Sequence, residues 1–161
     1  MLVFGAWVSA FGQPASIEKH FQANIKKYSM EHFAEGEDAS SGYDYLYYKD
    51  RQKIVKISSI WSASHSAEVR VEDFYIDDGS FFFRNSIALK KYLGALRKGK
   101  AAALNTINEF YFNGNKLTRW LSKGVEVRPT DSKWNTMERE ILERLAAEIE
   151  NYAWLKSEKQ N

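Results

Sequence analysis

The spacing of apolar residues predicts a helix near the start of the chain, followed by a series of strands. Between residues 16 and 34, apolar side chains recur every three or four positions, which places them on one face of a helix. This stripe consists of Ile17, Phe21, Ile25, Tyr28 and, at its end, His32. Polar and glycine residues at 35–42 then predict a loop. From residue 43 to 84 the period is two, as in Tyr43, Tyr45 and Tyr47, which indicates strands.

Two more helices are predicted downstream. Residues 86–97 gather apolar side chains on one side of a helix that ends before Gly99, and a strand pair is expected near 108–121. The last helix has the clearest signal, a 3.6-residue period over about six turns. Its stripe is Trp134, Met137, Ile141, Leu145, Ile149, Tyr152 and Leu155. The predicted fold is α+β: a twisted antiparallel meander of about five to seven strands, carrying an N-terminal, an inserted and a long C-terminal helix.

Three stretches of the chain align without gaps and predict three hairpins. They are YKDRQKI at 48–54, YIDDGSF at 75–81 and YFNGNKL at 111–117. Each has a tyrosine, an Asp or Asn two positions later, turn residues and then an apolar residue, and such turn residues adopt the positive φ angles of tight hairpins. The copies are 27 and 36 residues apart, which is too uneven for a solenoid. The acids at the second turn lack the further acids and the glutamate of a calcium loop.

The segments YYKDRQKIVKI, DFYIDDGSFFFRN and EFYFNGNKLTRWL resemble the hairpins of a group of small, exported, uncharacterised Gram-negative bacterial proteins. The resemblance covers about residues 43–155, and it implies a periplasmic or secreted protein without assigning any catalytic residue. A more distant likeness is to toxin–antitoxin repeats built from Tyr-x-x-Gly hairpins.

Residues 1–12, MLVFGAWVSAFG, are uncharged and apolar, and they predict the remnant of a signal peptide. Ala10 and Gly12 are small residues at the spacing that a signal peptidase requires before a cut. The alternative is a first strand or buried helix, because about ten apolar residues are too few to span a bilayer. Residues 13–161 are expected to form a single domain with no transmembrane segment, located in the periplasm or secreted.

Composition excludes several kinds of ligand and several kinds of site. Lys plus Arg number 23 and Asp plus Glu 21, a balance too even to predict nucleic-acid binding. The chain has no cysteine, which excludes disulfides, thiolate metal sites, a cysteine nucleophile and a lipoprotein anchor. Aromatic residues make up 15% of the chain, a content that suits either a sheet core or a stacking surface. No cofactor or metal motif is present.

Candidate catalytic groups are few and dispersed. His20 and His32 would point in different directions on one helix, and His65 lies in the serine-rich loop at 62–66. No nucleophile motif surrounds His65, although a small hydrolase could use it or a pair of carboxylates. Asp77 and Asp78 belong to a predicted turn. The sequence leaves the question of enzymatic activity open and favours a role without catalysis.

Two groups of residues are candidates for ligand binding. The first group is three rings expected on the sheet face away from the terminal helices: Tyr75, Tyr111 and Trp120. The second is four cations on the polar side of the helix at 86–97: Lys90, Lys91, Arg97 and Lys98. Rings can stack on a sugar or a peptide, and a cationic rim can bind an anion. The alternatives are a core sealed on both faces and an ordinary solvated helix surface.

The function expected from these observations is an exported binding or interaction module for a protein, a peptide or a glycan. The first alternative is the small hydrolase described above. The second is an inhibitor or immunity-type protein that docks onto its target through the hairpins.

Overall fold

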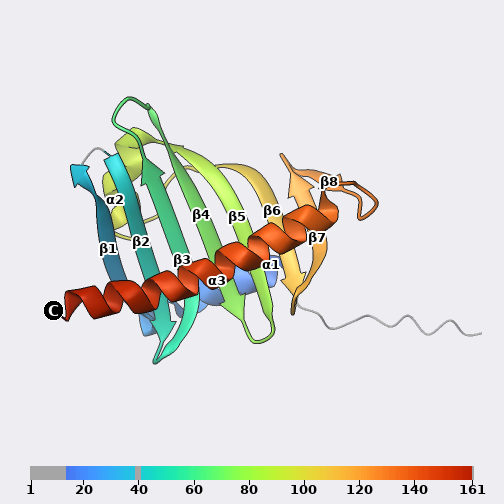
Figure 1. The fold of residues 1–161 in the computed structure, drawn as a ribbon, viewed down its shortest axis with the longest axis horizontal. Helices are drawn as coiled ribbons and strands as arrows, with labels where there is room; N and C mark the ends of the chain where they lie inside the picture. Colours follow the sequence, from blue (N-terminus) through green and yellow to red (C-terminus); the bar gives the residue numbers. More distant parts are fainter. Residues whose placement is uncertain (1–13, 39–40, 161) are drawn as a thin grey trace, which may run out of the picture.

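The computed structural model describes residues 14–38 and 41–160, so the predicted signal-peptide remnant lies outside the described residues. Its centre is an eight-stranded antiparallel sheet (Figure 1). The strands are β1 (Ser29–Asp38), β2 (Ser41–Asp50), β3 (Lys53–Ser62), β4 (Glu68–Asp77), β5 (Ser80–Leu89), β6 (Asn105–Asn113), β7 (Lys116–Ser122) and β8 (Val125–Val127). The helices are α1 (Pro14–Asn24), α2 (Leu93–Arg97) and α3 (Trp134–Lys159). The α+β class, the antiparallel meander and the long C-terminal helix are therefore confirmed.

Every strand pairs with the next one along the chain, so the sheet has no crossover. The three predicted hairpins are present, and their strands close at the pairs Asp50–Lys53, Asp77–Ser80 and Asn113–Lys116. Each turn contains a residue with positive φ: Arg51, Gly79 or Gly114. This is the backbone conformation that tight two-residue turns need, which is why turn chemistry in the sequence located them correctly.

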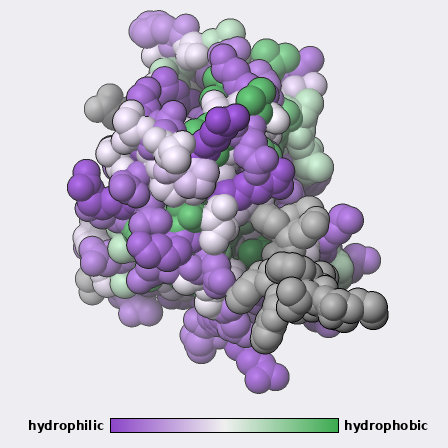
Figure 2. All heavy atoms as spheres, turned by 90° about the vertical axis from the view of Figure 1, so that its right-hand side faces the viewer, coloured by the Kyte–Doolittle hydropathy of each residue, from purple (hydrophilic) through white to green (hydrophobic). Residues whose placement is uncertain are grey.

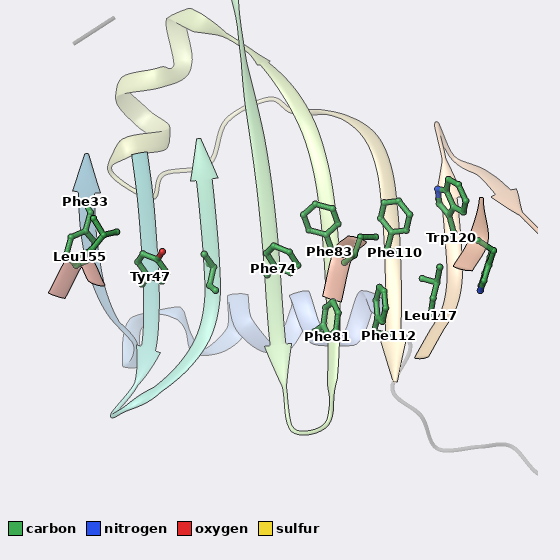
Figure 3. Close-up of a cluster of buried hydrophobic side chains, with 13 residues drawn as sticks. Phe33, Tyr47, Phe74, Phe81, Phe83, Phe110, Phe112, Leu117, Trp120 and Leu155 are labelled. Atoms are coloured by element: carbon green, nitrogen blue, oxygen red, sulfur yellow. The ribbon is translucent and has the colours of Figure 1, made fainter. Parts of the chain in front are cut away.

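Both faces of the sheet are covered. Helix α3 crosses one face, while α1 and α2 lie behind the sheet in the view of Figure 1. The face under α3 is filled with rings from almost every strand, among them Tyr47, Phe74, Phe83 and Phe110 (Figure 3). The side of the molecule near β7 and β8 presents mainly hydrophilic residues, with hydrophobic ones in smaller groups between them (Figure 2). A sheet covered on both faces requires apolar side chains at consecutive positions, which explains Phe81, Phe82 and Phe83.

The loop predicted at 35–42 is wrong in its bounds, because β1 runs to Asp38 and β2 begins at Ser41. The bounds of two predicted helices are also wrong. Helix α1 ends at Asn24, a short 3-10 turn follows at Ile25–Lys27, and β1 begins at Ser29. Of the predicted stripe, Ile25 and Tyr28 therefore lie outside the helix, and His32 lies in a strand. Residues 86–89 belong to β5, and the helical part that follows comprises a 3-10 turn at Lys90–Tyr92 and the five-residue α2. In both places pairing with neighbouring strands overrides a local helical spacing. With β1 and the short β8 added, the strand count exceeds the predicted range.

Candidate functional site

The three rings expected on one face of the sheet lie on two faces. Tyr75 and Tyr111 are buried on the side of α1 and α2, whereas Trp120 is buried under α3. A β-bulge explains the difference: Tyr111 pairs with Arg119 and Phe112 with Leu117, which leaves Thr118 as an extra residue. An extra residue shifts the following side chains to the other face. The prediction of a shared ring surface is therefore wrong.

The four cations of the second group, expected on one helix surface, differ in their contacts and in their exposure. Lys90 Nζ donates hydrogen bonds to the backbone carbonyls of Ala63 (2.7 Å) and Ser64 (3.3 Å). Arg97 Nε donates to Asp44 Oδ2 at 2.8 Å. Lys91 and Lys98 are exposed. Because Lys90 and Arg97 hold neighbouring parts of the fold together, the expected four-cation rim is reduced to two exposed lysines.

The histidines do not gather into a catalytic group in the described part of the chain. His65 is exposed on the loop between β3 and β4. His32 lies on β1, and its Nε2 is 2.7 Å from Oδ1 of the buried Asp44, which also binds Arg97. This arrangement ties β1, β2 and α2 together. No group of three or more His, Asp or Glu side chains that could hold a metal ion occurs among the described residues.

The strongest candidate site is a cavity of about 370 Å³ between the sheet and its α1 and α2 side, which we name the α1-side cavity. Helix α1 and the segment at 99–104 form its walls, and strands β2 to β6 form its floor. Its volume is in the range of small-molecule sites. The residues that line it and carry the argument below are Glu18, Phe21, Leu46, Tyr48, Lys56, Ser58, Ile60, Val71, Asp73, Tyr75, Arg84, Leu96, Lys100 and Leu104.

Strand register builds a polar row across the floor of this cavity. Ser58 on β3 is paired with Asp73 on β4, and Asp73 is paired with Arg84 on β5, so these three side chains point to the same face side by side. The positions before and after them on that face are mostly apolar, as Val71 and Phe82 show. A row of polar residues in the middle of a buried face conflicts with the needs of folding, and such conflicts are typical of functional sites.

Asp73 is the centre of the polar row. Asp73 is 3% exposed, and its carboxylate accepts a hydrogen bond of 2.5 Å from Ser58 Oγ. The Lys56 ammonium lies 3.3 Å from Oδ1, and Arg84 Nη2 lies 3.6 Å from Oδ2. Asp73 is therefore surrounded by three donors from two neighbouring strands, and its acceptor capacity is largely used within the protein.

Helix α1 adds a second carboxylate to the site. Arg84 Nη1 donates to Glu18 Oε2 at 3.3 Å, and Nη2 lies 3.2 Å from Oε1. Tyr75 Oη accepts a hydrogen bond from Arg84 Nη2 (3.2 Å) and donates one to Glu18 (3.4 Å). Burial lowers the pKa of Arg84, but the negative charges of Asp73 and Glu18 and the Tyr75 hydroxyl more than offset this and raise it overall. The guanidinium therefore stays charged.

Three aromatic rings surround the Lys56 ammonium. Its Nζ lies 4.6 Å from the ring centre of Tyr75, 5.2 Å from Phe21 and 5.5 Å from Tyr48. Ring faces attract a cation because their quadrupole is negative there. Burial raises the pKa of Tyr48 to about 12, and it raises the pKa of Tyr75 further. Both hydroxyls are therefore neutral around neutral pH, and the Tyr75 hydroxyl keeps the proton that it donates to Glu18.

The cavity offers more donors than acceptors to a ligand. Lys56 carries three N–H donors, and among the described residues the only carboxylate paired with it is Asp73. Arg84 Nε is buried and has no hydrogen-bond partner among the described residues. Three cations and two acids line the space, and the rest of the wall includes the apolar Leu46, Ile60 and Val71. The arrangement suits a ligand with an anionic group and an apolar body.

Comparisons of the chain with protein-family models, with curated proteins and with solved structures found no match. Among the described residues, no helix combines the length and the apolar character needed to cross a membrane.

Sequence reasoning missed the residues of the polar row, although a signal for them was present. Along β4, Val69 and Val71 alternate with Arg70 and Glu72, and the next residue on the face of the two valines is Asp73, where an apolar residue is expected. Ser58 is a second polar residue on this face, between Lys56 and Ile60 on β3. Each interruption alone is a weak signal. Only the strand register shows that they adjoin.

Proposed function

We propose that the protein is a binding module that takes up a small organic anion, such as a carboxylate with an apolar body, in the α1-side cavity. The observation that carries the proposal is the polar row, together with Lys56, on the floor of a cavity in an otherwise apolar face. Buried ion pairs contribute little to stability, and apolar residues of similar size often stabilise a fold more. A role in ligand binding explains why charged residues occupy these positions.

The anionic group is expected to bind between Lys56 and Arg84. Lys56 supplies free N–H donors, and Arg84 Nε supplies a buried donor that lacks an acceptor among the described residues. Hydrogen bonds to charged groups inside a protein are about twice as strong as those between neutral groups. The apolar body of the ligand would lie against Leu46, Ile60 and Val71. Its transfer from water supplies about 25 cal/mol per Å² of apolar surface buried.

Binding of octanoate tests the proposal, with octanamide as an uncharged probe of the same length. Titrations followed by calorimetry and by ¹H–¹⁵N NMR should show that octanoate binds at least tenfold more tightly than octanamide. Lys56→Met should remove this preference because the lost cation faces the anionic group. Lys53→Met is the matched control, since Lys53 lies on the same strand but pairs with Asp78 at the exposed hairpin. Equal binding of the two probes, or no binding of octanoate, would contradict the proposal.

We also propose that the protein is exported to the periplasm or secreted. The proposal rests on residues 1–12, whose composition and small residues at 10 and 12 are typical of the end of a signal peptide. Mass spectrometry of the protein purified from its natural source should find Gln13 at the N-terminus. Recovery of protein that retains Met1 would contradict it.

A further inference from the structure

Helix α3 carries a glutamate where its contact with the sheet requires an apolar residue. Positions two turns apart on a helix lie on nearly the same face, and Trp134, Ile141 and Leu155, which are spaced in this way, are all buried against the sheet. Glu148 occupies the remaining position of this series. Ile149, which the apolar stripe assigned to the sheet-facing side, is 44% exposed instead. The middle of the helix therefore turns a carboxylate toward the sheet.

Glu148 faces a second cavity, of about 340 Å³, on the opposite side of the sheet from the α1-side cavity; we name it the α3-side cavity. Two rows of paired residues form its floor. Tyr45, Ser59 and Glu72 form the row nearer to the helix. Tyr43, Trp61 and Arg70 form the next row, close to strand ends that extend beyond α3 (Figure 1).

The aromatic residues of these rows form a ring shelf consisting of Tyr43, Tyr45 and Trp61. The rings of Tyr43 and Tyr45 are nearly parallel, with an interplanar angle of 8° and ring centres 6.0 Å apart. The Trp61 ring centre lies 6.5 Å from that of Tyr43. Tyr43 is 46% exposed, which is unusual in a sheet whose other rings are mostly buried. An aromatic surface thus remains accessible beside a polar cavity.

Polar groups of both charges face the ring shelf. Ser59 Oγ donates a hydrogen bond of 3.0 Å to Glu148 Oε1, and Arg144 Nη1 donates one of 2.5 Å to Glu72 Oε1. The Arg70 guanidinium lies 5.1 Å from the Trp61 ring centre. Burial raises the pKa of Glu148 above its usual range, and the nearby Glu72 raises it further, while the hydrogen bond from Ser59 lowers it in part.

We propose that the α3-side cavity binds a neutral saccharide, with one sugar ring stacked on the ring shelf and its hydroxyl groups bonded to the carboxylates and arginines of the cavity. The C–H face of a sugar ring packs on an aromatic face because that face carries the negative part of the quadrupole. The two arginines that line the cavity disfavour a cationic ligand, and the two glutamates disfavour an anionic one. A neutral ligand rich in hydroxyl groups uses both kinds of side chain.

Three neutral hexasaccharides test the inference: cellohexaose, maltohexaose and the hexamer of β-1,4-linked N-acetylglucosamine. In ¹H–¹⁵N NMR titrations, at least one of them should bind with a dissociation constant below 10 mM and shift the indole N–H signal of Trp61. Tyr43→Ala should weaken this binding at least tenfold, because it removes an accessible part of the shelf. Trp154→Ala is the matched control, since that ring is 53% exposed on α3 and does not line the cavity.

The outcomes separate this inference from the proposed anion site. Lys56 lies on the other face of the sheet, so Lys56→Met should leave saccharide binding unchanged. No binding of any of the three hexasaccharides would overturn the inference, and so would binding that Tyr43→Ala leaves intact. Because octanoate binding is measured separately, either site can fail without affecting the other.

Discussion

The charges buried on the floor of the α1-side cavity predict a large effect of a single substitution, Asp73→Ala. Asp73 is 3% exposed. Its carboxylate accepts a 2.5 Å hydrogen bond from Ser58 and lies 3.3 Å from the Lys56 ammonium and 3.6 Å from the Arg84 guanidinium. Its removal leaves the largely buried Lys56 without its carboxylate partner, while Arg84 keeps its ion pair with Glu18. Removing one partner of a buried ion pair costs about 3–5 kcal/mol. Since small domains unfold with about 5–15 kcal/mol, the variant should fold but with much of its stability lost.

A double substitution shows whether this cost comes from uncompensated charge. Lys56→Met removes the cation that depends most on Asp73, while Arg84 retains its contacts with Glu18. In the double variant the cost of Asp73→Ala should therefore be smaller than in the wild-type background. Contacting charged residues usually couple by about 0.5–3 kcal/mol. The sum of the stability losses of the two single variants should therefore exceed the loss of the double variant by at least about 1 kcal/mol.

Urea unfolding followed by circular dichroism measures these free energies of unfolding, provided that the slope of the unfolding free energy against urea concentration is the same for all variants. Asp78→Ala is the matched control, because it removes a carboxylate from an exposed pair with Lys53 at a hairpin tip, and its midpoint should not change. A loss below about 1 kcal/mol for Asp73→Ala, the level of an average substitution, would refute the reasoning. Strict additivity in the double variant would show that Lys56 and Asp73 do not depend on each other.

Three further predictions concern α3 and the segment around α2, and urea unfolding measures them all. Ile141 is 3% exposed, so Ile141→Ala should cost about 2–5 kcal/mol of stability. Ile149 is largely exposed, and Ile149→Ala should change stability by less than about 0.5 kcal/mol. Similar losses for the two variants would show that the helix packs on the sheet differently. The raised pKa of Glu148 means that the folded state binds the proton of this carboxyl more tightly than the unfolded state does. The wild type should therefore lose stability relative to Glu148→Gln as pH rises from about 4 through the raised pKa. A difference in unfolding free energy that does not change with pH would contradict this. Gly99→Ala should destabilise the fold by more than about 1 kcal/mol, because φ is +67° and a Cβ would clash with the Tyr48 hydroxyl. Gly94→Ala is the control: its Cβ would meet nothing within 4 Å, so it should be neutral or stabilising by up to about 1 kcal/mol.

Local chemistry explains which parts of the fold the sequence predicted well. The hairpins at Asp50–Lys53, Asp77–Ser80 and Asn113–Lys116 depend on turn residues that are neighbours in the chain. Helix α3 depends on a period sustained over its whole length. β1 has no comparable local signal. Its backbone hydrogen bonds are completed by β2, and a spacing of three to four apolar residues cannot reveal that partner.

The candidate sites were harder to predict because they depend on which face each side chain points to. The bulge at Thr118 moves Trp120 to the face opposite Tyr111, and no turn or propensity signal in the sequence marks it. In the structure, the Thr118 hydroxyl donates a hydrogen bond of 2.9 Å to the Tyr111 carbonyl at this bulge. The cation group failed for a related reason, since Lys90 and Arg97 bind groups that are distant in the sequence. Long-range contacts decide both cases.

The two proposed sites meet at one point in the sheet, the adjacent residues Ser58 and Ser59 at the centre of β3. Neighbouring residues of a strand point to opposite faces, so Ser58 lines the α1-side cavity and Ser59 lines the α3-side cavity. Each serine donates a hydrogen bond to a carboxylate, Ser58 to Asp73 and Ser59 to Glu148. A strand covered on both faces normally carries large apolar residues at such positions, as the rings in Figure 3 do elsewhere in this sheet. Two small hydroxyl residues instead leave room on both sides of one strand and bind the buried Asp73 on one side and the half-buried Glu148 on the other. This is why we propose binding at these two places rather than at the hairpin tips.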